Sequence, residues 1–211
     1  MASDKIRNQI IDATLALAAE RPFGDIRMSE IAARAGVGLD DLNGAFRSRV
    51  EIVSAFVQRI DRAVLAGEGE TTEESSRERV FDVLMRRFDA LTPYRAGLRA
   101  ILHAARTDLL LALALNGMGL RAMAWMLEAA DAGRTGLRGA IRAQGLAVIW
   151  ARSLGVWLEG DAPDLDKTMA ALDRGLTQGE QAVHFVERIG DCARAPFKSR
   201  RAESPNGEPA A

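Results

Sequence analysis

A glycine-flanked turn between two short helical segments constrains the fold of this chain more than any other feature. The apolar spacing predicts one helix over residues 28–35 and a second over residues 39–46. Between them stands Gly36-Val37-Gly38, and its glycines interrupt the helical pattern. Two short helices joined by a glycine-containing turn form a helix-turn-helix unit.

Helical periodicity extends over most of the remaining sequence. One helix is expected at 4–19, before the turn unit, and another at 49–66, after it. Ser75 and Glu78 have the spacing of a capping box, which marks the start of a further helix. Ala, Leu and Arg are the commonest residues and favour helix, and no convincing strand pattern occurs. More helices are expected from Thr92 onward and at 107–131, 136–158 and 164–189. The chain is therefore predicted to be all-α.

A polar, acidic stretch divides the sequence into two units. Residues 67–76 read GEGETTEESS, a composition that is typical of a linker between packed domains. A head domain is thus expected at 1–66 and a larger helical domain at 77–190. Residues 191–211 lack apolar periodicity and are expected to form a disordered tail.

Charge and cysteine content narrow the functional classes. Lys and Arg together number 28 and Asp and Glu 29, so the chain lacks the basic excess that is typical of nucleic-acid binders. The single cysteine, Cys192, cannot form an intramolecular disulfide, and no signal-peptide pattern is present. The longest apolar stretches, such as Leu109 to Leu115, are shorter than the roughly 20 residues that span a bilayer. A cytoplasmic protein is expected.

Motifs for catalysis or metal binding are weak. Residues 117–122 read GMGLRA, which fits the letters of a dinucleotide-binding motif, but no strand precedes them and their flanks are helical. The glycines are instead expected to allow close helix packing or a kink beside a cavity. His103 and His184 are the only histidines and lie in different helices, and Glu180 with His184 is a single i, i+4 pair. We therefore expect no enzyme, no cofactor and no metal site.

A specific set of residues stands within and directly after the turn unit. The sequence IAARAGVG at 31–38 is followed by Leu42, Phe46, Ser48, Arg49 and Ile52. This pattern, over about residues 5–60, resembles the N-terminal domain of TetR-family transcriptional regulators. The resemblance implies a TetR-like fold: a three-helix helix-turn-helix head and a C-terminal helical domain for ligand binding and dimerisation. It also implies a homodimer in which a ligand controls the spacing of two heads on operator DNA.

The resemblance assigns DNA-contacting positions to the head. They are the start of the second helix, the outer face of the third, and the junction after it, which gives Arg27, Ser29, Leu39, Asn43, Arg47, Ser48 and Arg49. The third helix departs from the family pattern, because Asn43 stands where an aromatic residue is usual and Asp40 and Asp41 are acidic. Residues 1–62 carry nine Lys or Arg and nine Asp or Glu. The head is therefore neutral, whereas phosphate contacts call for positive charge.

A second resemblance concerns the C-terminal half. Residues 140–147 and 156–158, and above all LDKTMAALDR at 165–174, resemble the lipid-binding domain of ubiquinone-biosynthesis accessory proteins. Those proteins share the TetR fold, have lost DNA binding, and present an isoprenoid or phospholipid ligand to a hydroxylase. An accessory protein of this kind, in peripheral contact with a membrane, is the alternative to a DNA-binding regulator.

Large, soft side chains in the C-terminal half are candidates for a ligand pocket. Trp150 and Trp157 are seven residues apart and lie on one side of a helix. The full candidate set is Met85, Phe88, Met118, Trp125, Trp150 and Trp157. A pocket lined by them would accept a hydrophobic small molecule or an isoprenoid lipid. The surplus of apolar residues at 136–158 and 164–189 predicts that these two helices pair with their copies in a dimer. The sequence as a whole predicts a ligand-responsive transcriptional regulator.

Overall fold

A computed structural model of the chain describes residues 3–67, 75–133, 135–160 and 165–194, which contain helices and no strand. The all-α prediction is confirmed. The helices of the head are α1 (Asp4–Glu20), α2 (Met28–Ala35) and α3 (Leu39–Ala45), with a short 3₁₀ turn, η1 (Phe23–Asp25), between the first two. Then follow α4 (Arg49–Leu65), α5 (Ser76–Leu91), η2 (Thr92–Tyr94), α6 (Arg95–Ala104), α7 (Leu109–Ala129), α8 (Gly136–Glu159) and α9 (Asp166–Arg194).

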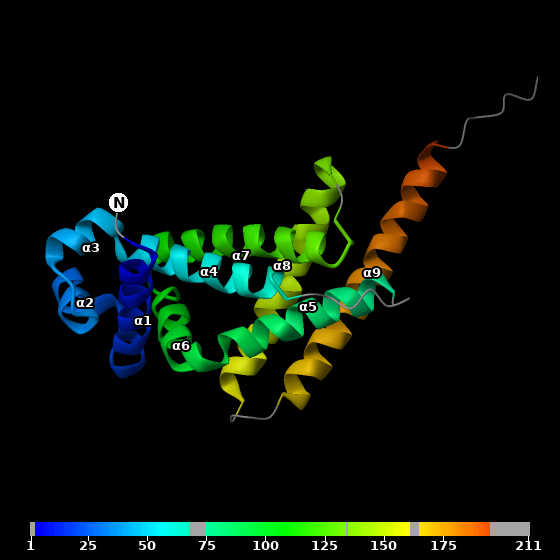
Figure 1. Ribbon diagram of the computed structural model, residues 1–211. Coiled ribbons are helices and arrows are strands. Elements are labelled where there is room, and N and C mark those ends of the chain that lie inside the picture. The colour runs from blue at the N-terminus through cyan, green and yellow to red at the C-terminus, as the bar shows by residue number, and fades with distance from the viewer. Residues whose placement is uncertain (1–2, 68–74, 134, 161–164, 195–211) are drawn as a thin grey trace, which may run out of the picture.

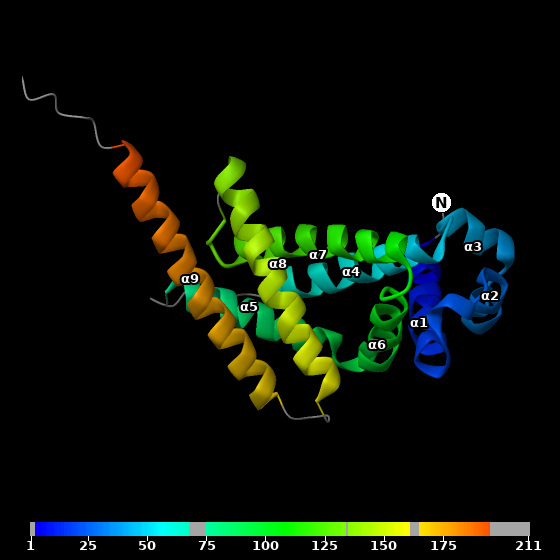
Figure 2. The same ribbon diagram turned by 180° about the vertical axis from the view of Figure 1, so that it is seen from behind.

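The helices form an elongated bundle with the head at one end. Figure 1 shows α1, α2 and α3 grouped at that end, with α4 running from them alongside α7. Helix α6 stands between α1 and the rest of the bundle. At the far end α8 and α9 lie side by side, which Figure 2 shows from behind, and α5 packs against α9. The head is thus joined to the bundle through both α4 and α6.

Side-chain and glycine caps fix several helix ends. Ser75 Oγ accepts from the Glu78 N–H at 3.3 Å, and the Ser75 N–H donates to Glu78 Oε2 at 2.8 Å, which confirms the predicted capping box. These bonds hold the pKa of the Glu78 carboxyl below its usual value. Gly36 ends α2 with φ +67°, a left-handed conformation that glycine adopts without steric cost.

The end of the last helix differs from the sequence expectation. The helical domain was expected to end at residue 190, but α9 continues to Arg194. That end was set by the loss of apolar periodicity after Gly190, and a single glycine inside a helix is tolerated at a cost of about 1 kcal/mol. The rest of the expected tail and most of the expected linker at 67–76 lie outside the described residues.

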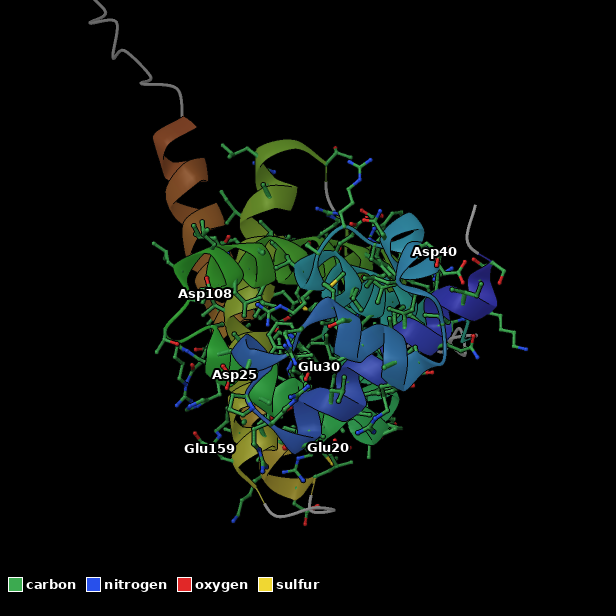
Figure 3. All side chains as sticks on the ribbon, turned by 90° about the vertical axis from the view of Figure 1, so that its left-hand side faces the viewer. Glu20, Asp25, Glu30, Asp40, Asp108 and Glu159 are labelled. Atoms are coloured by element: carbon green, nitrogen blue, oxygen red, sulfur yellow. The ribbon has the colours of Figure 1, made fainter. Side chains whose placement is uncertain are left out.

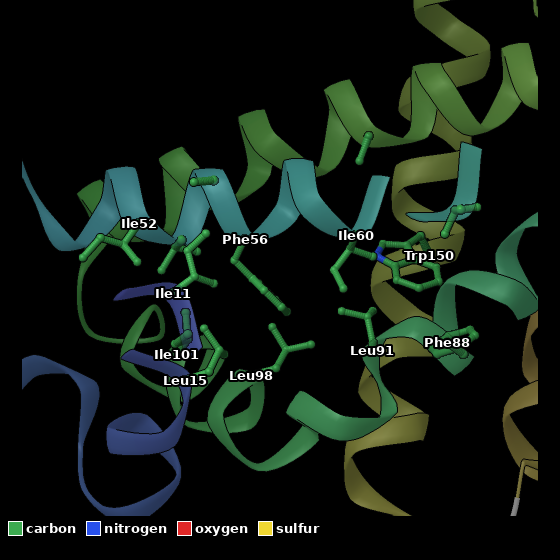
Figure 4. Close-up of a cluster of buried hydrophobic side chains, with 14 of the residues drawn as sticks. Ile11, Leu15, Ile52, Phe56, Ile60, Phe88, Leu91, Leu98, Ile101 and Trp150 are labelled. Carbon is green, nitrogen blue, oxygen red and sulfur yellow. The ribbon is translucent and has the colours of Figure 1, made fainter. Parts of the chain in front are cut away.

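One continuous core runs from the head into the bundle. Figure 4 shows Ile11 and Leu15 of α1 facing Leu98 and Ile101 of α6, with Phe56 of α4 beside them. Farther along, the core continues through side chains of α4, α5 and α8, namely Ile60, Leu91, Phe88 and Trp150. The two predicted units therefore share their buried side chains, and their relative position is set by packing.

A close backbone contact joins the head to α6. Gly97 of α6 lies against α1, and a Cβ at this position would be 2.4 Å from the backbone oxygen of Leu15. No side chain fits at that distance, so the two helices approach this closely only because residue 97 is glycine.

A buried ion pair joins α4 to α5. Arg87 and Asp61 form a salt bridge, and their side chains are only 5% and 12% exposed. The Arg87 guanidinium also lies 5.4 Å from the ring centroid of Trp150. Because Arg87 Nε has no hydrogen-bond partner among the described residues, Asp61 supplies the principal compensation for this buried charge.

Helix α7 is unusually apolar for a surface element. Among the described residues it is the one helix long and apolar enough to cross a membrane, with 21 residues and a mean hydropathy of 1.4. No such segment was expected from the sequence, because Asn116 and Arg121 interrupt the apolar stretches of α7. In the fold α7 packs against α4, α5 and α8, yet only 22% of its apolar window is buried.

Replacing Gly97 with Ala is expected to destabilise the protein by about 1–3 kcal/mol, because the new methyl group must separate α1 from α6. Denaturant unfolding of the two proteins measures the difference. Gly119→Ala is the matched control: Gly119 is also within a helix, and no atom lies within 4 Å of the position that its Cβ would take, so stability should rise by up to about 1 kcal/mol. Equal effects of the two substitutions would contradict the close contact.

Replacing Asp61 with Ala is expected to cost about 3–5 kcal/mol, because the Arg87 charge then stays buried without its partner. The double variant Asp61→Leu, Arg87→Met removes both charges and should recover most of that loss. Thermal and denaturant unfolding of the three proteins provide the comparison. A loss below about 1 kcal/mol in the single variant would show that solvent reaches Arg87.

Candidate nucleic-acid interface

The outer face of α3 is a free surface at the end of the head. Leu42 and Ala45 turn inward and are buried, whereas Leu39 is 55% exposed and Asn43 is also exposed. These are the two positions on this helix that the family resemblance assigned to DNA contacts. Figure 3 views the molecule from the head and shows Asp40 on the same exposed helix.

The start of α2 is held by a charged network. The Arg27 backbone N–H donates to Glu30 Oε2 at 2.8 Å, and the side chains of Arg21 and Arg27 pair with the same carboxylate. Chiefly because of the backbone hydrogen bond from Arg27, the pKa of Glu30 is lowered to about 2. Glu30 therefore stays ionised at any physiological pH. The Arg27 side chain is 78% exposed, and Ser29 is exposed in the same turn.

The junction between α3 and α4 combines a cap with a free cation. Ser48 caps α4 by accepting from the Glu51 N–H at 3.2 Å, and the Arg47 backbone N–H donates to Glu51 Oε2 at 2.7 Å. The side chain of Arg47 is exposed and forms no ion pair within the described residues. Arg47 is thus available for an anionic partner, whereas Ser48 has a structural role.

Arg49 has a different environment from the one that the sequence suggested. Its Nη1 donates to the backbone oxygens of Phe23, Gly24 and Ile26 at 2.5–3.0 Å, and its guanidinium lies 5.3 Å from the Phe23 ring centroid. This side chain ties α4 to the segment between α1 and α2. Arg49 therefore stabilises the packing of α4 against the rest of the head.

Internal partners occupy most other cations of the head. Arg34 pairs with Glu20 and Arg59 with Asp12. The pair with Arg34 lowers the pKa of Glu20 and raises that of Arg34. Arg7 donates to the backbone oxygen of Ala45 at 2.8 Å and lies 4.2 Å from the Phe46 ring centroid. Few cations of the head are therefore free of internal partners, and Arg27 and Arg47 are the most exposed of those assigned to DNA contacts.

The six predicted ligand-binding residues do not form one pocket. Phe88, Trp150 and Trp157 come together in the core, with ring centroids 4.5 and 5.6 Å from that of Phe88, and they fill the space themselves. Met85 and Met118 are half-buried at the edge of the core. Trp125 lies apart from them and is 53% exposed.

A hollow between α7 and α8 lies elsewhere on the bundle. It has a volume of about 480 Å³. Small side chains dominate its lining, which comprises Gly117, Leu120, Arg121, Ala124, Leu127, Glu128, Gly133, Gly139, Ala140 and Ala143. Close helix packing or a kink beside a cavity was expected at Gly117, and Gly117 does line this hollow. Within the part of the chain that the structure describes, nothing lies within 4 Å of a Cβ on Gly117, so no helix packs closely against it there.

The other lining residues were not predicted, because the candidate ligand-binding residues were large, soft side chains and most of this lining is small. The signal that could have found them is a helical face of small residues: Gly117, Ala124 and Glu128 are seven and four residues apart on α7 and so share one side.

Comparison with known proteins agrees with this geometry. Residues 10–56 match the family described as bacterial regulatory proteins, tetR family. The whole fold is similar to a TetR transcriptional regulator from Nitrosomonas europaea, with 24% identity, a TM-score of 0.67, and 83% of this chain and 98% of that chain covered.

Two other solved structures give the same result. A TetR transcriptional regulator from Rhodococcus sp. RHA1 is 23% identical, with a TM-score of 0.62 and coverage of 83% and 95%. A tetR-family regulator from Streptomyces coelicolor is 19% identical, with a TM-score of 0.56 and coverage of 89% of each chain. Among curated proteins, none is similar enough to match. Residues 10–56 therefore carry the helix-turn-helix of the tetR family of bacterial regulatory proteins, and the chain has the TetR fold.

Proposed function

We propose that this chain is a cytoplasmic, ligand-responsive transcriptional regulator of the TetR type that binds operator DNA as a homodimer. The observation that carries the proposal is the free outer face of α3, which presents Leu39 and Asn43, in a head that also exposes the side chains of Arg27 and Arg47. A helix exposed in this way can enter the major groove, while flanking cations and the helix N-termini contact phosphates.

The bundle offers a route from a ligand to the head. The hollow between α7 and α8 has a largely apolar lining with one cation, Arg121, and one anion, Glu128, which favours a hydrophobic ligand with a polar group. Helix α4 packs along α7, is linked to α5 through Asp61 and Arg87, and leads directly into the head. A ligand that shifts α7 would therefore displace α4 and change the spacing of the two heads in the dimer. If the ligand favours one spacing and DNA the other, the ligand can change the affinity for DNA only as much as its own affinity differs between the two.

The acidic surface of α3 supports a second candidate, a lipid-binding accessory protein without DNA binding. Asp40 and Asp41 are both exposed, and carboxylates facing phosphates are repelled. In a regulator these carboxylates must accept from cytosine amino groups or lie clear of the backbone. The regulator remains our principal proposal because the tetR-family match covers the helix-turn-helix itself.

Replacing Arg47 with Ala should weaken binding to all DNA sequences about equally and reduce the slope of log K against log salt by about 1. Stability should change little, because the side chain is exposed and unpaired within the described residues. Arg49→Ala is the matched comparison, and it should destabilise the head by about 1–3 kcal/mol through the three carbonyls that it leaves unpaired. Fluorescence anisotropy at several salt concentrations and thermal unfolding measure the two effects. A salt slope in Arg47→Ala equal to that of the wild type would show that Arg47 does not contact phosphates.

Replacing both Asp40 and Asp41 with Asn separates the two candidate functions. In a regulator the wild type binds DNA from upstream of its own gene specifically at physiological salt, and the double variant changes the sequence preference. In an accessory protein the wild type binds no site specifically, and the variant only gains weak, salt-sensitive binding. Native mass spectrometry of the purified protein supplies the second measurement. If the purified protein carries an isoprenoid lipid and forms no specific DNA complex, the proposal of a regulator is wrong.

A further inference from the structure

A second hollow lies between α1 and α4, which pack against each other in the head (Figure 1). Its volume is about 360 Å³, close to the roughly 300 Å³ at which small-ligand sites begin. Most of its lining is polar or charged, and the lining comprises Asp4, Arg7, Asn8, Ile11, Ala55, Gln58, Arg59, Arg62 and Ala63. The hollow between α7 and α8 is by contrast largely apolar, so the two hollows would accept different ligands.

Cations outnumber carboxylates around the hollow between α1 and α4. Three arginines line it, against one carboxylate, Asp4. Asp4 stands in the first turn of α1, where the positive end of the helix dipole offsets part of its charge. Arg59 is paired at 2.7 Å with Asp12, which lies outside the lining. Arg7 and Arg62 carry the remaining positive charge.

Arg62 has no internal partner. Its side chain is exposed and forms no ion pair or hydrogen bond within the described residues. An exposed arginine on a helix is most often simply solvated, and a cation in the last turn of α4 also suits the helix dipole. Arg62 differs from such a residue because it shares a hollow with two other guanidinium groups. Like charges repel, and an anion between them removes the repulsion.

Arg7 has donors to spare. Its Nη1 donates to the backbone oxygen of Ala45 at 2.8 Å, whereas its Nε and Nη2 form no hydrogen bond within the described residues. Ala45 is the last residue of α3, and the carbonyls at the end of a helix have no partner within that helix. An anion in the hollow can therefore bind Arg7, and it then competes with the Ala45 carbonyl for this side chain.

A phosphate monoester matches these donors better than a carboxylate does. It presents three terminal oxygens, enough for the guanidinium groups of Arg7 and Arg62 at once. A carboxylate has two oxygens, and one guanidinium group engages both in the bidentate geometry. The side-chain amides of Asn8 and Gln58 also line the hollow and can hydrogen-bond to hydroxyl groups of the ligand. The lining thus favours a small, polar, phosphorylated molecule.

The DNA backbone is a less suitable source of this phosphate. Arg62 stands 14 positions after Ser48, which places it about 21 Å along α4 from the junction with α3. Figure 1 shows α4 leading away from α3 toward the bundle. A backbone phosphodiester also has only two unbridged oxygens. A phosphate at Arg62 would therefore belong to a molecule bound beside the head.

We propose that the hollow between α1 and α4 is an effector site of its own, which binds a phosphorylated small molecule between Arg7 and Arg62. The phosphate draws Arg7 away from the Ala45 carbonyl, so the end of α3 loses a contact that ties it to α1. The affinity for DNA then falls. Binding in the hollow is independent of the proposed function, and only the effect on DNA rests on it.

Calorimetric titration of the whole chain tests the site. The probes are inorganic phosphate and glycerol phosphate at constant ionic strength, and glycerol is the uncharged control. Both phosphates should bind and glycerol should not. Arg62→Gln should raise both dissociation constants at least about tenfold, because a charged donor is lost, and should leave thermal stability unchanged, because the side chain has no partner within the described residues.

Arg106→Gln is the matched control for this titration. Arg106 is also exposed, has no side-chain partner within the described part of the chain, and does not line the hollow. Its replacement should leave both dissociation constants unchanged. Failure of both phosphates to bind, or equal losses in Arg62→Gln and Arg106→Gln, would overturn the site.

Hydrogen exchange tests the displacement of Arg7. With glycerol phosphate bound, the amides of α3 should exchange about two- to tenfold faster, because the end of α3 has lost one hydrogen bond. Arg62→Gln at the same probe concentration should show no change. Unchanged or slower exchange of α3 in the wild type with bound probe would overturn the link between the hollow and α3.

Fluorescence anisotropy with DNA from upstream of the chain's own gene separates failure of this inference from failure of the proposed function. Glycerol phosphate should weaken the wild-type complex about two- to tenfold and leave the Arg62→Gln complex unchanged. A protein that binds the probe but no DNA specifically would retain the site and overturn the regulator. A DNA complex that is insensitive to bound probe would retain the regulator and overturn the effect on α3. If Arg62→Gln lowers the salt slope of DNA binding without any probe, the phosphate is that of the DNA backbone and our proposal is wrong.

Discussion

The contact of Gly97 with the backbone of Leu15 sets the position of the head on the bundle. Helix α6 holds α1 through this contact, and on its other side it holds the end of α8. Arg95 Nη2 donates to the Trp157 backbone oxygen, and Arg99 donates to that of Leu158. These guanidinium groups satisfy carbonyls that a helix terminus leaves without partners. The ten residues of α6 therefore connect the head directly to the last turn of α8.

Most charged side chains of the head hold its own segments together. Three carbonyls of the segment before α2 converge on Arg49, and Glu30 holds the first turn of α2 while ionised. Such internal partners fix the angle at which α3 is presented. They also reduce the positive charge available for phosphates, so affinity for DNA would depend on a few free side chains such as Arg47 and on the contacts of α3. A neutral head favours selectivity over strong non-specific binding.

Much of the fold could be predicted from the sequence, because the residues that form a helix cap or a turn are close neighbours in the chain. The Gly36 turn and the Ser75 capping box are visible in the sequence and confirmed in the structure. The role of Arg49 was not predictable from its neighbours, since its partners lie 23–26 positions earlier in the chain. The aromatic candidates Trp150 and Trp157 share a helical side as expected, but that side faces Phe88 in the core. Periodicity identifies an inner face and does not tell whether a neighbouring side chain or a ligand fills it.

The unequal burial of the three tryptophans gives the chain a built-in optical label. Trp150 and Trp157 are 7% and 5% exposed, close to Phe88 and to the cations Arg87 and Arg95, whereas Trp125 is 53% exposed on α7. A solvent-facing indole emits at longer wavelength and is reached by soluble quenchers, and the enclosed ones are not. The red component of the intrinsic emission therefore originates mainly from α7, and it reports on the surroundings of that helix without any attached dye.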